Sequence, residues 1–203
     1  VITSAFRSAG QRCSALRVLY LQEDVADKMI ELLRGAMAEL VLGDPQALSS
    51  DIGPVIDVEA QTAIKRHIAG LETRAKCIAK APKHLKQGTG FFVAPQAWEI
   101  GSLKTLSNEV FGPILHVIRY RAEELQAIIE DIRASDFALT MGVHSRLHGL
   151  HKRLEDEALI GNLYINRDTV GAVVGSNPFG GHGLSGTGPK AGGPDYLKRL
   201  VRE

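Results

Sequence analysis

The chain has 203 residues, 44% of them hydrophobic, and its 24 Lys and Arg face 23 Asp and Glu, for a formal net charge of +1. This composition suffices to bury the core of one α/β domain, and the absence of a basic stripe or charge block argues against a nucleic-acid or membrane partner. The balanced charge favours a small-molecule site, and the short apolar runs broken by charges argue against a membrane span or secretory signal. Two cysteines far apart in the sequence favour a reduced, cytoplasmic setting.

The first part of the chain predicts a strand followed by amphipathic helices. Residues 16–22 are rich in strand-forming side chains. We expect Asp24 to cap a helix that runs to about Leu40, and a second helix to occupy about 57–75. The inner face of the first helix is predicted to carry Val25, Met29, Leu32, Leu33, Met37 and Leu40.

The middle of the chain continues the alternation of strands and helices. Short strands are predicted near 77–79 and at 91–93, with a turn around Gly88 between them. A longer apolar run predicts a strand over 114–120, and the pattern that follows it predicts a helix over 122–134.

The last part adds a strand over 138–144, a helix over 146–158 and a strand over 159–165. Strands that alternate with helices of this length predict an α/β fold of three layers, a largely parallel sheet with helices on both faces. Ligands of such sheets bind beyond the carboxyl ends of the strands. Residues 171–193 contain nine glycines, so we interpret 166–194 as a structured loop within a single domain over 1–203.

Cys13 is the first candidate for chemistry, because it lies between an expected helix end and a strand, among small residues. A thiolate is the reactive form of cysteine, and Arg7 and Arg12 could supply positive charge that favours it. The backbone N–H of Cys13 could help to bind an oxyanion. The alternative is a buried structural cysteine. For Cys77, which begins an apolar strand, we expect that structural role, and we expect both cysteines to be reduced.

Glu109 and Phe111 form the second candidate pair, inside the segment 108–113. Residues two apart share a side of an extended chain, so the carboxylate and the ring are expected to face one way. Such a pair suits the hydroxyls of a ribose and a flat heterocycle. The alternative is an exposed glutamate beside a core phenylalanine.

The glycine-rich loop is the third candidate. Glycine-permitted turns can aim successive backbone N–H groups at one point, which makes a site for a carboxylate. The alternative is an ordinary surface turn.

Two further patterns are interpreted as non-functional. Residues 181–186 match the dinucleotide fingerprint G-x-G-x-x-G, but a Gly-Pro pair follows where the required helix should run. His144, His148 and His151 recur at helical spacing, as metal ligands do, but cationic residues beside them favour a solvated helix face.

Together these segments resemble the aldehyde dehydrogenase superfamily. The resemblance covers nearly the whole chain and is carried by 6–13, by 109–113, and by Asn166 with 178–181. A narrower resemblance leads to the pyrroline-5-carboxylate (glutamate γ-semialdehyde) dehydrogenase part of the proline utilisation A family of bifunctional bacterial enzymes. It is carried by the segments 8–17, 170–175 and 183–194.

The resemblance implies an NAD-dependent oxidation of glutamate γ-semialdehyde to glutamate, the second step of proline breakdown. Cys13 would attack the aldehyde, a hydride would pass to NAD, and the resulting thioester would be hydrolysed. Glu109 would hold the nicotinamide ribose, and Phe111 would pack beside the nicotinamide.

The resemblance also implies a set of substrate contacts. Ser14 and the backbone of Gly171 and Ala172 would bind the α-carboxylate of the substrate, and Phe179 would pack on its aliphatic part. No metal is implied. FAD would belong only to a separate proline dehydrogenase domain, of which this sequence shows nothing.

The chain begins at Val1 without a Met, and we expect it to be the catalytic segment of a longer protein. The family's cofactor domain, its glutamate general base and its asparagine oxyanion donor all precede the cysteine. The chain alone is therefore expected to be inactive and to self-associate through exposed apolar surface. The alternatives are another aldehyde dehydrogenase, a cysteine acyltransferase, or an inactive assembly or binding module.

Overall fold

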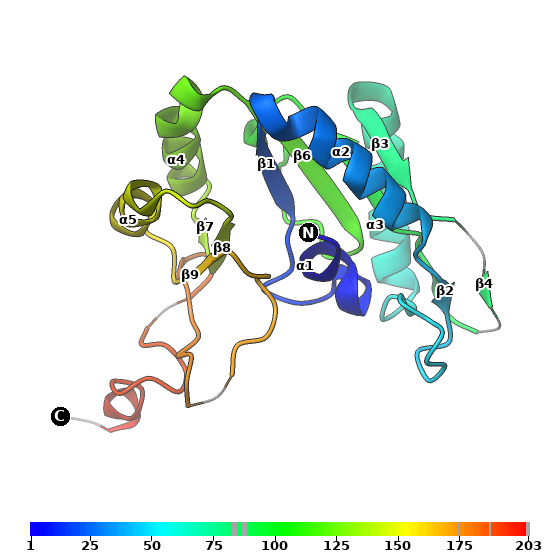
Figure 1. Cartoon of the computed structure of the whole chain (residues 1–203). Helices are drawn as coiled ribbons and strands as arrows, with labels where there is room; N and C mark the ends of the chain where they lie inside the picture. Colours follow the sequence, from blue (N-terminus) through cyan, green and yellow to red (C-terminus); the bar gives the residue numbers. More distant parts are fainter. Residues whose placement is uncertain (83–84, 87–88, 174, 187, 202–203) are drawn as a thin grey trace. The chain divides into compact units, whose positions relative to one another are not determined.

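The computed structural model describes the chain as two compact units. It covers residues 1–82, 85–86, 89–173, 175–186 and 188–201. The first unit is Val1–Glu123 and the second is Glu124–Glu203, and each is described by itself (Figure 1). The turn predicted around Gly88 lies outside the described residues. That the whole chain acts as one domain stays a prediction.

A four-stranded sheet forms the centre of the first unit, in the order β1-β6-β5-β3. Its strands are β1 (Val18–Gln22), β6 (Ile114–Tyr120), β5 (Gln96–Glu99) and β3 (Lys76–Lys80). The first three run parallel to one another, and β3 pairs antiparallel with β5. The predicted, largely parallel sheet is confirmed.

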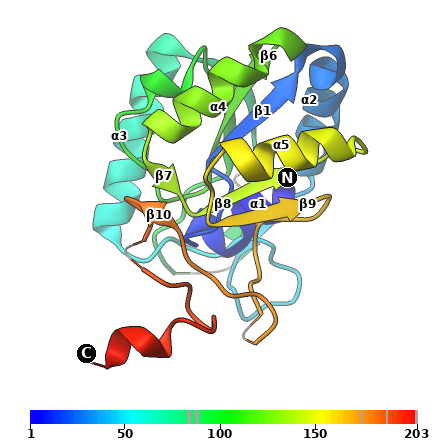
Figure 2. The same ribbon diagram turned by 90° about the vertical axis from the view of Figure 1, so that its left-hand side faces the viewer.

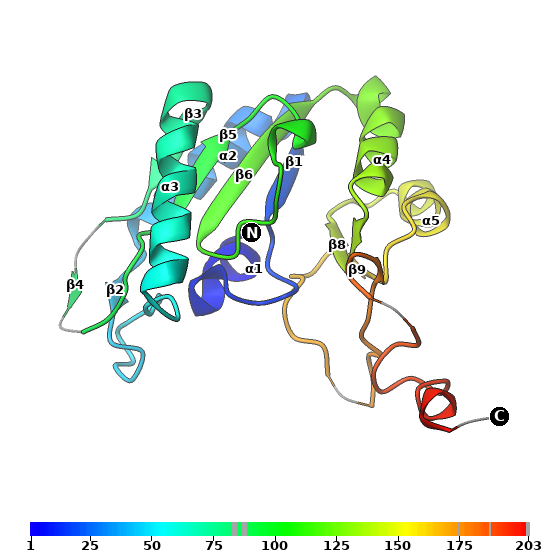
Figure 3. The ribbon, with the colours of Figure 1, turned by 180° about the vertical axis from the view of Figure 1, so that it is seen from behind.

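Helices cover both faces of this sheet. Helix α2 (Glu23–Ala38) lies on one face and α3 (Val58–Arg74) on the other, as the opposite views in Figures 1 and 3 show. Helix α3 begins after Asp57, whose side chain accepts a 2.7 Å hydrogen bond from the N–H of Ala60. The smaller elements of this unit are α1 (Ile2–Phe6), η1 (Arg7–Gly10), β2 (Leu42–Gly43), β4 (Leu85–Lys86), η2 (Leu103–Thr105) and η3 (Ala122–Glu124).

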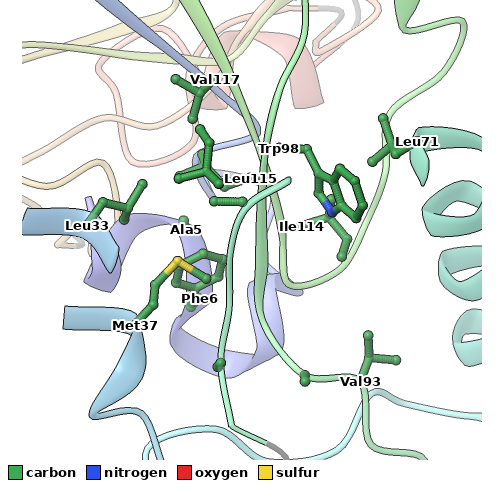
Figure 4. Packing of buried hydrophobic residues seen from close by; sticks show 14 of the residues in the cluster. Ala5, Phe6, Leu33, Met37, Leu71, Val93, Trp98, Ile114, Leu115 and Val117 are labelled. Atoms are coloured by element: carbon green, nitrogen blue, oxygen red, sulfur yellow. The ribbon is translucent and has the colours of Figure 1, made fainter. Parts of the chain in front are cut away.

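The alternation of side chains along β6 separates the two layers of the core (Figure 4). Leu115 and Val117 face the side that Met37 of α2 covers, whereas Ile114 lies on the side of Trp98. All five of these residues are at most 2% exposed. Full burial of one large apolar side chain stabilises a fold by roughly 1.5–3 kcal/mol, so this strand is the centre of the unit.

Helix α2 differs from its prediction at its start and in its buried face. Its N-cap is Gln22, and Asp24 lies in the first turn instead of capping the helix. Val25 and Leu32 are 51% and 56% exposed, so their assignment to the inner face was wrong. The buried stripe is Ala26, Ile30, Leu33 and Met37. Because the small Ala26 belongs to this face, the buried face is centred away from Val25 and Leu32. The prediction had placed those two residues inside because their side chains are large and apolar.

The strand predicted at 91–93 is also wrong. Phe91 makes only an isolated bridge to Val55, and the strand that joins the sheet is β5. The sequence of β5 begins and ends with polar residues, so it lacks a strand-like apolar run. Its burial comes from its place between β6 and β3, where Trp98 donates a 3.0 Å bond to the side chain of Gln96.

Cys77 is exposed, which contradicts its expected burial in the core. It lies on β3, at the end of the strand order, where only one face of the strand packs inward. Ile78 takes the inward position and is 6% exposed. Adjacent strand residues point to opposite faces, so Cys77 points outward.

The second unit has a small core between helices and two strand pairs. Helices α4 (Leu125–Ala134) and α5 (His148–Glu157) accompany the parallel strands β8 (Thr140–Val143) and β9 (Asn162–Ile165) (Figure 2). Strand β7 (Phe137–Ala138) pairs antiparallel with β10 (His182–Gly183), and η4 (Leu197–Leu200) follows. The core consists of Ile129, Val143, Leu154 and Ala158. The helices and strands predicted from 122 to 165 are confirmed, with bounds a few residues shorter.

None of the helices in the described parts of the chain is long and apolar enough to cross a membrane.

Candidate active site

Cys13 follows a turn of unusual backbone conformation. Ser8, Ala9 and Gly10 have φ values of 57°, 53° and 66°, in the left-handed region that costs roughly 1–2 kcal/mol for each residue with a side chain. The N–H of Gln11 donates a 3.0 Å bond to the carbonyl of Ser8, and this bond helps to close the turn. Cys13 itself is exposed. The local backbone therefore presents the thiol at the surface of the unit, as a nucleophile requires.

The turn packs directly against the segment 108–113. A Cβ atom added to Gly10 would lie 2.2 Å from the carbonyl oxygen of Gly112, and one added to Gly112 would lie 2.4 Å from Cδ1 of Ile64 on α3. Both glycines are buried. The absence of side chains at these positions lets the cysteine turn, the segment 108–113 and helix α3 meet.

Arg17 connects the two candidate motifs of the first unit. Its Nε donates a 2.9 Å bond to Oε1 of Glu109, and its guanidinium lies 4.6 Å from the ring centroid of Phe111. Nη2 donates a 3.0 Å bond to the carbonyl of Arg12, and Nη1 donates to the carbonyl of Gly10. One side chain thus holds both the cysteine turn and the acid–aromatic pair.

The charge of Arg17 is balanced by this environment. Burial lowers the pKa of Arg17, and the hydrogen bond and charge of Glu109, followed by the charge of Cys13, oppose that effect. Guanidinium groups remain protonated in proteins at neutral pH. Arg17 therefore supplies positive charge near Cys13, in addition to the charge expected from Arg7 and Arg12. The Nε of Arg12 donates a 3.0 Å bond to Oγ of Ser8 within the turn.

Glu109 and Phe111 face one way, as the sequence predicted, because both contact the same guanidinium. The Glu109 side chain is 39% exposed and Phe111 is 46% exposed. The expectation that they form a site is thus compatible with their geometry, and the alternative of a core phenylalanine is excluded by its exposure.

A groove of about 850 Å³ opens beside this pair, a volume in the range of small-molecule sites. Among the described residues, Oε2 of Glu109 has no hydrogen-bond partner, and one face of the Phe111 ring is not covered by Arg17. These features fit the ribose hydroxyls and the flat ring of a nicotinamide cofactor. The groove is lined by Ser8, Gln11, Ile56, Asn108, Glu109, Val110, Phe111 and by residues of α3 from Ala60 to Arg74.

Ser14 lies directly after the cysteine and is 6% exposed. Only a small part of its side chain reaches the surface of the first unit. Its proposed contact with a substrate carboxylate stays a prediction.

The other predicted substrate residues belong to the second unit. Gly171 has a φ of 101° and is exposed, as is Ala172. Within the described part of the chain, neither of their backbone N–H groups has an acceptor. Phe179 is half-buried and forms an antiparallel bridge with Ala191, with N–O distances of 3.0 and 2.9 Å. The loop thus offers donors of the kind that the prediction requires.

Asn166 anchors the beginning of this loop. Its φ is 55°, and its side-chain amide bonds both the N–H and the carbonyl of Ser145 at 2.9 Å. Asparagine tolerates the left-handed region better than most residues. The side chain therefore holds the chain in the bend that leads from β9 into the glycine-rich loop.

Two residues that sequence reasoning missed are Arg17 and His116. Arg17 lies 92 positions from Glu109, and no local pattern predicts their contact. His116 is 1% exposed on β6, and its Nδ1 lies 3.0 Å from the carbonyl of Arg17. Its signal in the sequence was a histidine in the middle of the apolar run 114–118.

The two patterns interpreted as non-functional lie in the second unit, and that interpretation stays a prediction. In the segment 181–186, strand β10 leads into turns, and the described residues that come next contain no helix before η4. Nε2 of His151 bonds the carbonyl of Ser145 at 3.0 Å. The described residues include no group of three or more His, Cys, Asp or Glu side chains placed to hold a metal ion.

The fold and the site define a class. A parallel α/β sheet carries an exposed cysteine beside a guanidinium and a groove, and this arrangement is typical of enzymes that use a cysteine nucleophile. A family model described as "Aldehyde dehydrogenase family" matches residues 1–202. The chain belongs to the aldehyde dehydrogenase family.

Comparison with individual proteins shows which members of the family this chain resembles. The chain is 52% identical to "Bifunctional protein PutA" of Klebsiella aerogenes over 99% of this chain and 16% of the relative. It is 35% identical to "1-pyrroline-5-carboxylate dehydrogenase" of Geobacillus sp. (strain WCH70), over 97% of this chain and 38% of the relative. A crystal structure of Bradyrhizobium japonicum proline utilization A (PutA), mutant D779W, matches with a TM-score of 0.94 and 52% identity. That match covers 99% of this chain and 20% of the solved chain. The chain thus spans less than two fifths of the length of these relatives.

Proposed function

We propose that the chain is the catalytic segment of an NAD-dependent dehydrogenase that oxidises L-glutamate γ-semialdehyde to L-glutamate, the second step of proline breakdown. The observation that carries this proposal is the connection of the exposed Cys13 turn to Glu109 and Phe111 through Arg17. The similarity to relatives named PutA and 1-pyrroline-5-carboxylate dehydrogenase supports the choice of substrate.

The reaction begins with Cys13. Its thiolate attacks the aldehyde carbon, so that a sulfur–carbon bond forms and the carbonyl oxygen takes the negative charge. The backbone N–H of Cys13 donates to that oxygen in this proposal. Bound NAD supplies the acceptor for the hydride that leaves this carbon. The carbonyl then re-forms as a thioester, and water hydrolyses the thioester to the carboxylic acid and restores the thiol.

Glu109 and Phe111 hold the cofactor in this proposal. Oε2 of Glu109 accepts from the ribose hydroxyls, and the exposed face of Phe111 packs beside the nicotinamide. A preference for NAD over NADP stays a prediction, as do a cytoplasmic setting and self-association.

The second unit selects the substrate in this proposal. The backbone N–H groups of Gly171 and Ala172 donate to the α-carboxylate. A contact of Ser14 with the carboxylate stays a prediction from the resemblance. Phe179 packs on the aliphatic part of the substrate. A general aldehyde dehydrogenase would not need such donors, and an inactive assembly module would need neither these donors nor a reactive thiol.

The test uses the full-length polypeptide that carries this chain. Formation of NADH is measured with glutamate γ-semialdehyde for the wild type, for Cys13→Ser and for Cys77→Ser, in which the other exposed cysteine is replaced. We expect the first variant to lose essentially all turnover and the second to keep it. If Cys13→Ser still forms NADH, Cys13 is not the nucleophile. If the wild type forms no NADH, the alternative of an inactive assembly or binding module is favoured.

A further inference from the structure

The backbone of Arg17 is held at the beginning of the central sheet. It directly precedes β1, and its carbonyl oxygen lies 3.0 Å from Nδ1 of the buried His116 on the neighbouring strand β6. Its side chain is only 15% exposed. A largely buried side chain that starts from a hydrogen-bonded backbone has few alternative positions, so the groups that it contacts are held in place.

The contacts of Arg17 fall on two functional groups at once. Its N–H groups donate to the carbonyls of Gly10 and Arg12, which stand three residues and one residue before the proposed nucleophile. Its Nε takes one oxygen of Glu109, and its plane covers one face of Phe111. The other oxygen of Glu109 has no hydrogen-bond partner among the described residues, and both Glu109 and Phe111 line the groove. Arg17 thus contacts only one carboxylate oxygen of Glu109 and one face of the Phe111 ring.

We propose that Arg17 is a positioning residue that holds the Cys13 turn and the cofactor-binding pair Glu109–Phe111 in one fixed arrangement. This inference rests on the proposed function. Glu109 would otherwise be an exposed carboxylate with free rotation, and the left-handed turn at Ser8 and Ala9 would lose two of the donors that stabilise it. Arg17 stabilises the left-handed turn before Cys13 and fixes the orientation of the Glu109 carboxylate before the cofactor binds.

Lysine cannot replace arginine in this role. A guanidinium is planar and carries N–H groups in a fixed fork, so it can bond three acceptors while it stacks on a ring. An ammonium is a point charge on a flexible chain and can satisfy only part of this set. Arg17→Lys therefore keeps the charge and removes the geometry, which separates positioning from electrostatics.

The experiment uses the full-length polypeptide with Arg17→Gln, Arg17→Lys, Glu109→Gln and the double variant of Arg17→Gln with Glu109→Gln. Arg119→Gln is the matched control, because Arg119 also forms ion pairs on this sheet, with Asp27 at 2.7 Å, away from the cysteine turn. The first readout is the dissociation constant for NAD, measured by titration calorimetry. The second is the rate at which iodoacetamide labels Cys13, with Cys77 in the same sample as the internal reference.

We expect Arg17→Gln to weaken NAD binding by about tenfold or more, the usual effect of losing a charge-assisted hydrogen bond, and to slow labelling of Cys13 relative to Cys77. Arg17→Lys should restore part of the labelling rate but little of the affinity for NAD. The double variant should bind NAD no more weakly than the worse single variant, because both changes break one contact. Arg119→Gln should change neither readout.

The outcomes separate this inference from the proposed function. If Glu109→Gln weakens NAD binding but both Arg17 variants bind it as the wild type does, Arg17 does not position the pair, although the proposed function stands. A wild type that does not bind NAD overturns both. If Arg17→Gln fails to fold, Arg17→Lys decides, because full affinity for NAD in that variant also contradicts positioning by the guanidinium.

Discussion

His67 and His116 join helix α3 to the centre of the sheet through a distance of 2.8 Å between their Nε2 atoms. Nδ1 of His116 faces the carbonyl of Arg17, so it must carry a hydrogen, and Nε2 of the neutral ring then accepts from His67. Protonation of His116 at Nε2 would set two N–H groups against each other. The hydrogen bond between the rings therefore holds only while His116 is neutral.

The histidine pair predicts a loss of stability in acid. Burial lowers the pKa of His116 to about 4. The hydrogen bond to the carbonyl of Arg17 opposes this shift, and the positive charges of His67, Arg17 and Arg74 add to it. Burial also lowers the pKa of His67. Because the unfolded chain binds these protons near pH 6.5, the stability is fully present above that pH and is lost as the pH falls towards 4. The contribution of His116 is roughly 3 kcal/mol.

Thermal unfolding of the full-length polypeptide between pH 4.5 and 7 checks this expectation. His116→Gln removes the titrating ring and should flatten the pH dependence, although it lowers the stability at pH 7. Identical pH dependence in the variant and the wild type would show that the pair does not carry the effect.

Gly10 should tolerate no side chain. Gly10→Ala combines a φ of 66° with a Cβ that would lie 2.2 Å from the carbonyl oxygen of Gly112, so we expect it to lower the free energy of unfolding by at least about 2 kcal/mol. Gly35→Ala is the matched control, because Gly35 lies inside α2 with no neighbouring atom within 4 Å. That variant should gain about 0.5–1 kcal/mol. Denaturant titration of both variants measures the difference, and equal effects would refute the tight packing.

Cys13 should react faster than Cys77 although both are exposed. Hydrogen bonds from Arg17 to the carbonyls of Gly10 and Arg12 hold the turn that presents Cys13, and no such contact with a guanidinium is described for Cys77. Brief treatment with iodoacetamide followed by peptide mass mapping compares the two thiols in one sample. Faster labelling of Cys77 would argue against Cys13 as the nucleophile.

The glycine-rich loop should favour substrates that carry an α-carboxylate. Loss of a charge-assisted hydrogen bond costs about 1.5–3 kcal/mol, so an aldehyde of similar length without the carboxylate should be used with at least about tenfold lower kcat/KM. Gly171→Ala should reduce this preference, because Gly171 has a φ of 101°. Gly149→Ala, in an open helical position on α5, serves as the control. Steady-state kinetics with both aldehydes decides, and equal efficiency would indicate a general aldehyde dehydrogenase.

The local sequence pattern was enough to predict a helix or strand where the burial of that element follows from its own residues. Strand β6 was predicted with its observed bounds because a largely apolar run follows a Gly-Pro pair, and α3 was predicted at about 57–75, close to its observed bounds. The cysteine turn, the shared side of Glu109 and Phe111, and the absence of a helix after the segment 181–186 were likewise readable from neighbouring residues.

Only the tertiary structure decided the features that depend on distant neighbours. The polar-ended strand β5 is buried because β6 and β3 flank it, and Cys77 is exposed because β3 ends the sheet. Arg17 meets Glu109 across 92 positions of sequence, and His67 meets His116 across 49. Short-range periodicity records which face of an element is apolar, but it does not record which polar side chains the folded sheet brings together. The sequence by itself therefore determined the elements and the candidate residues, and packing of the sheet decided how Arg17 joins them.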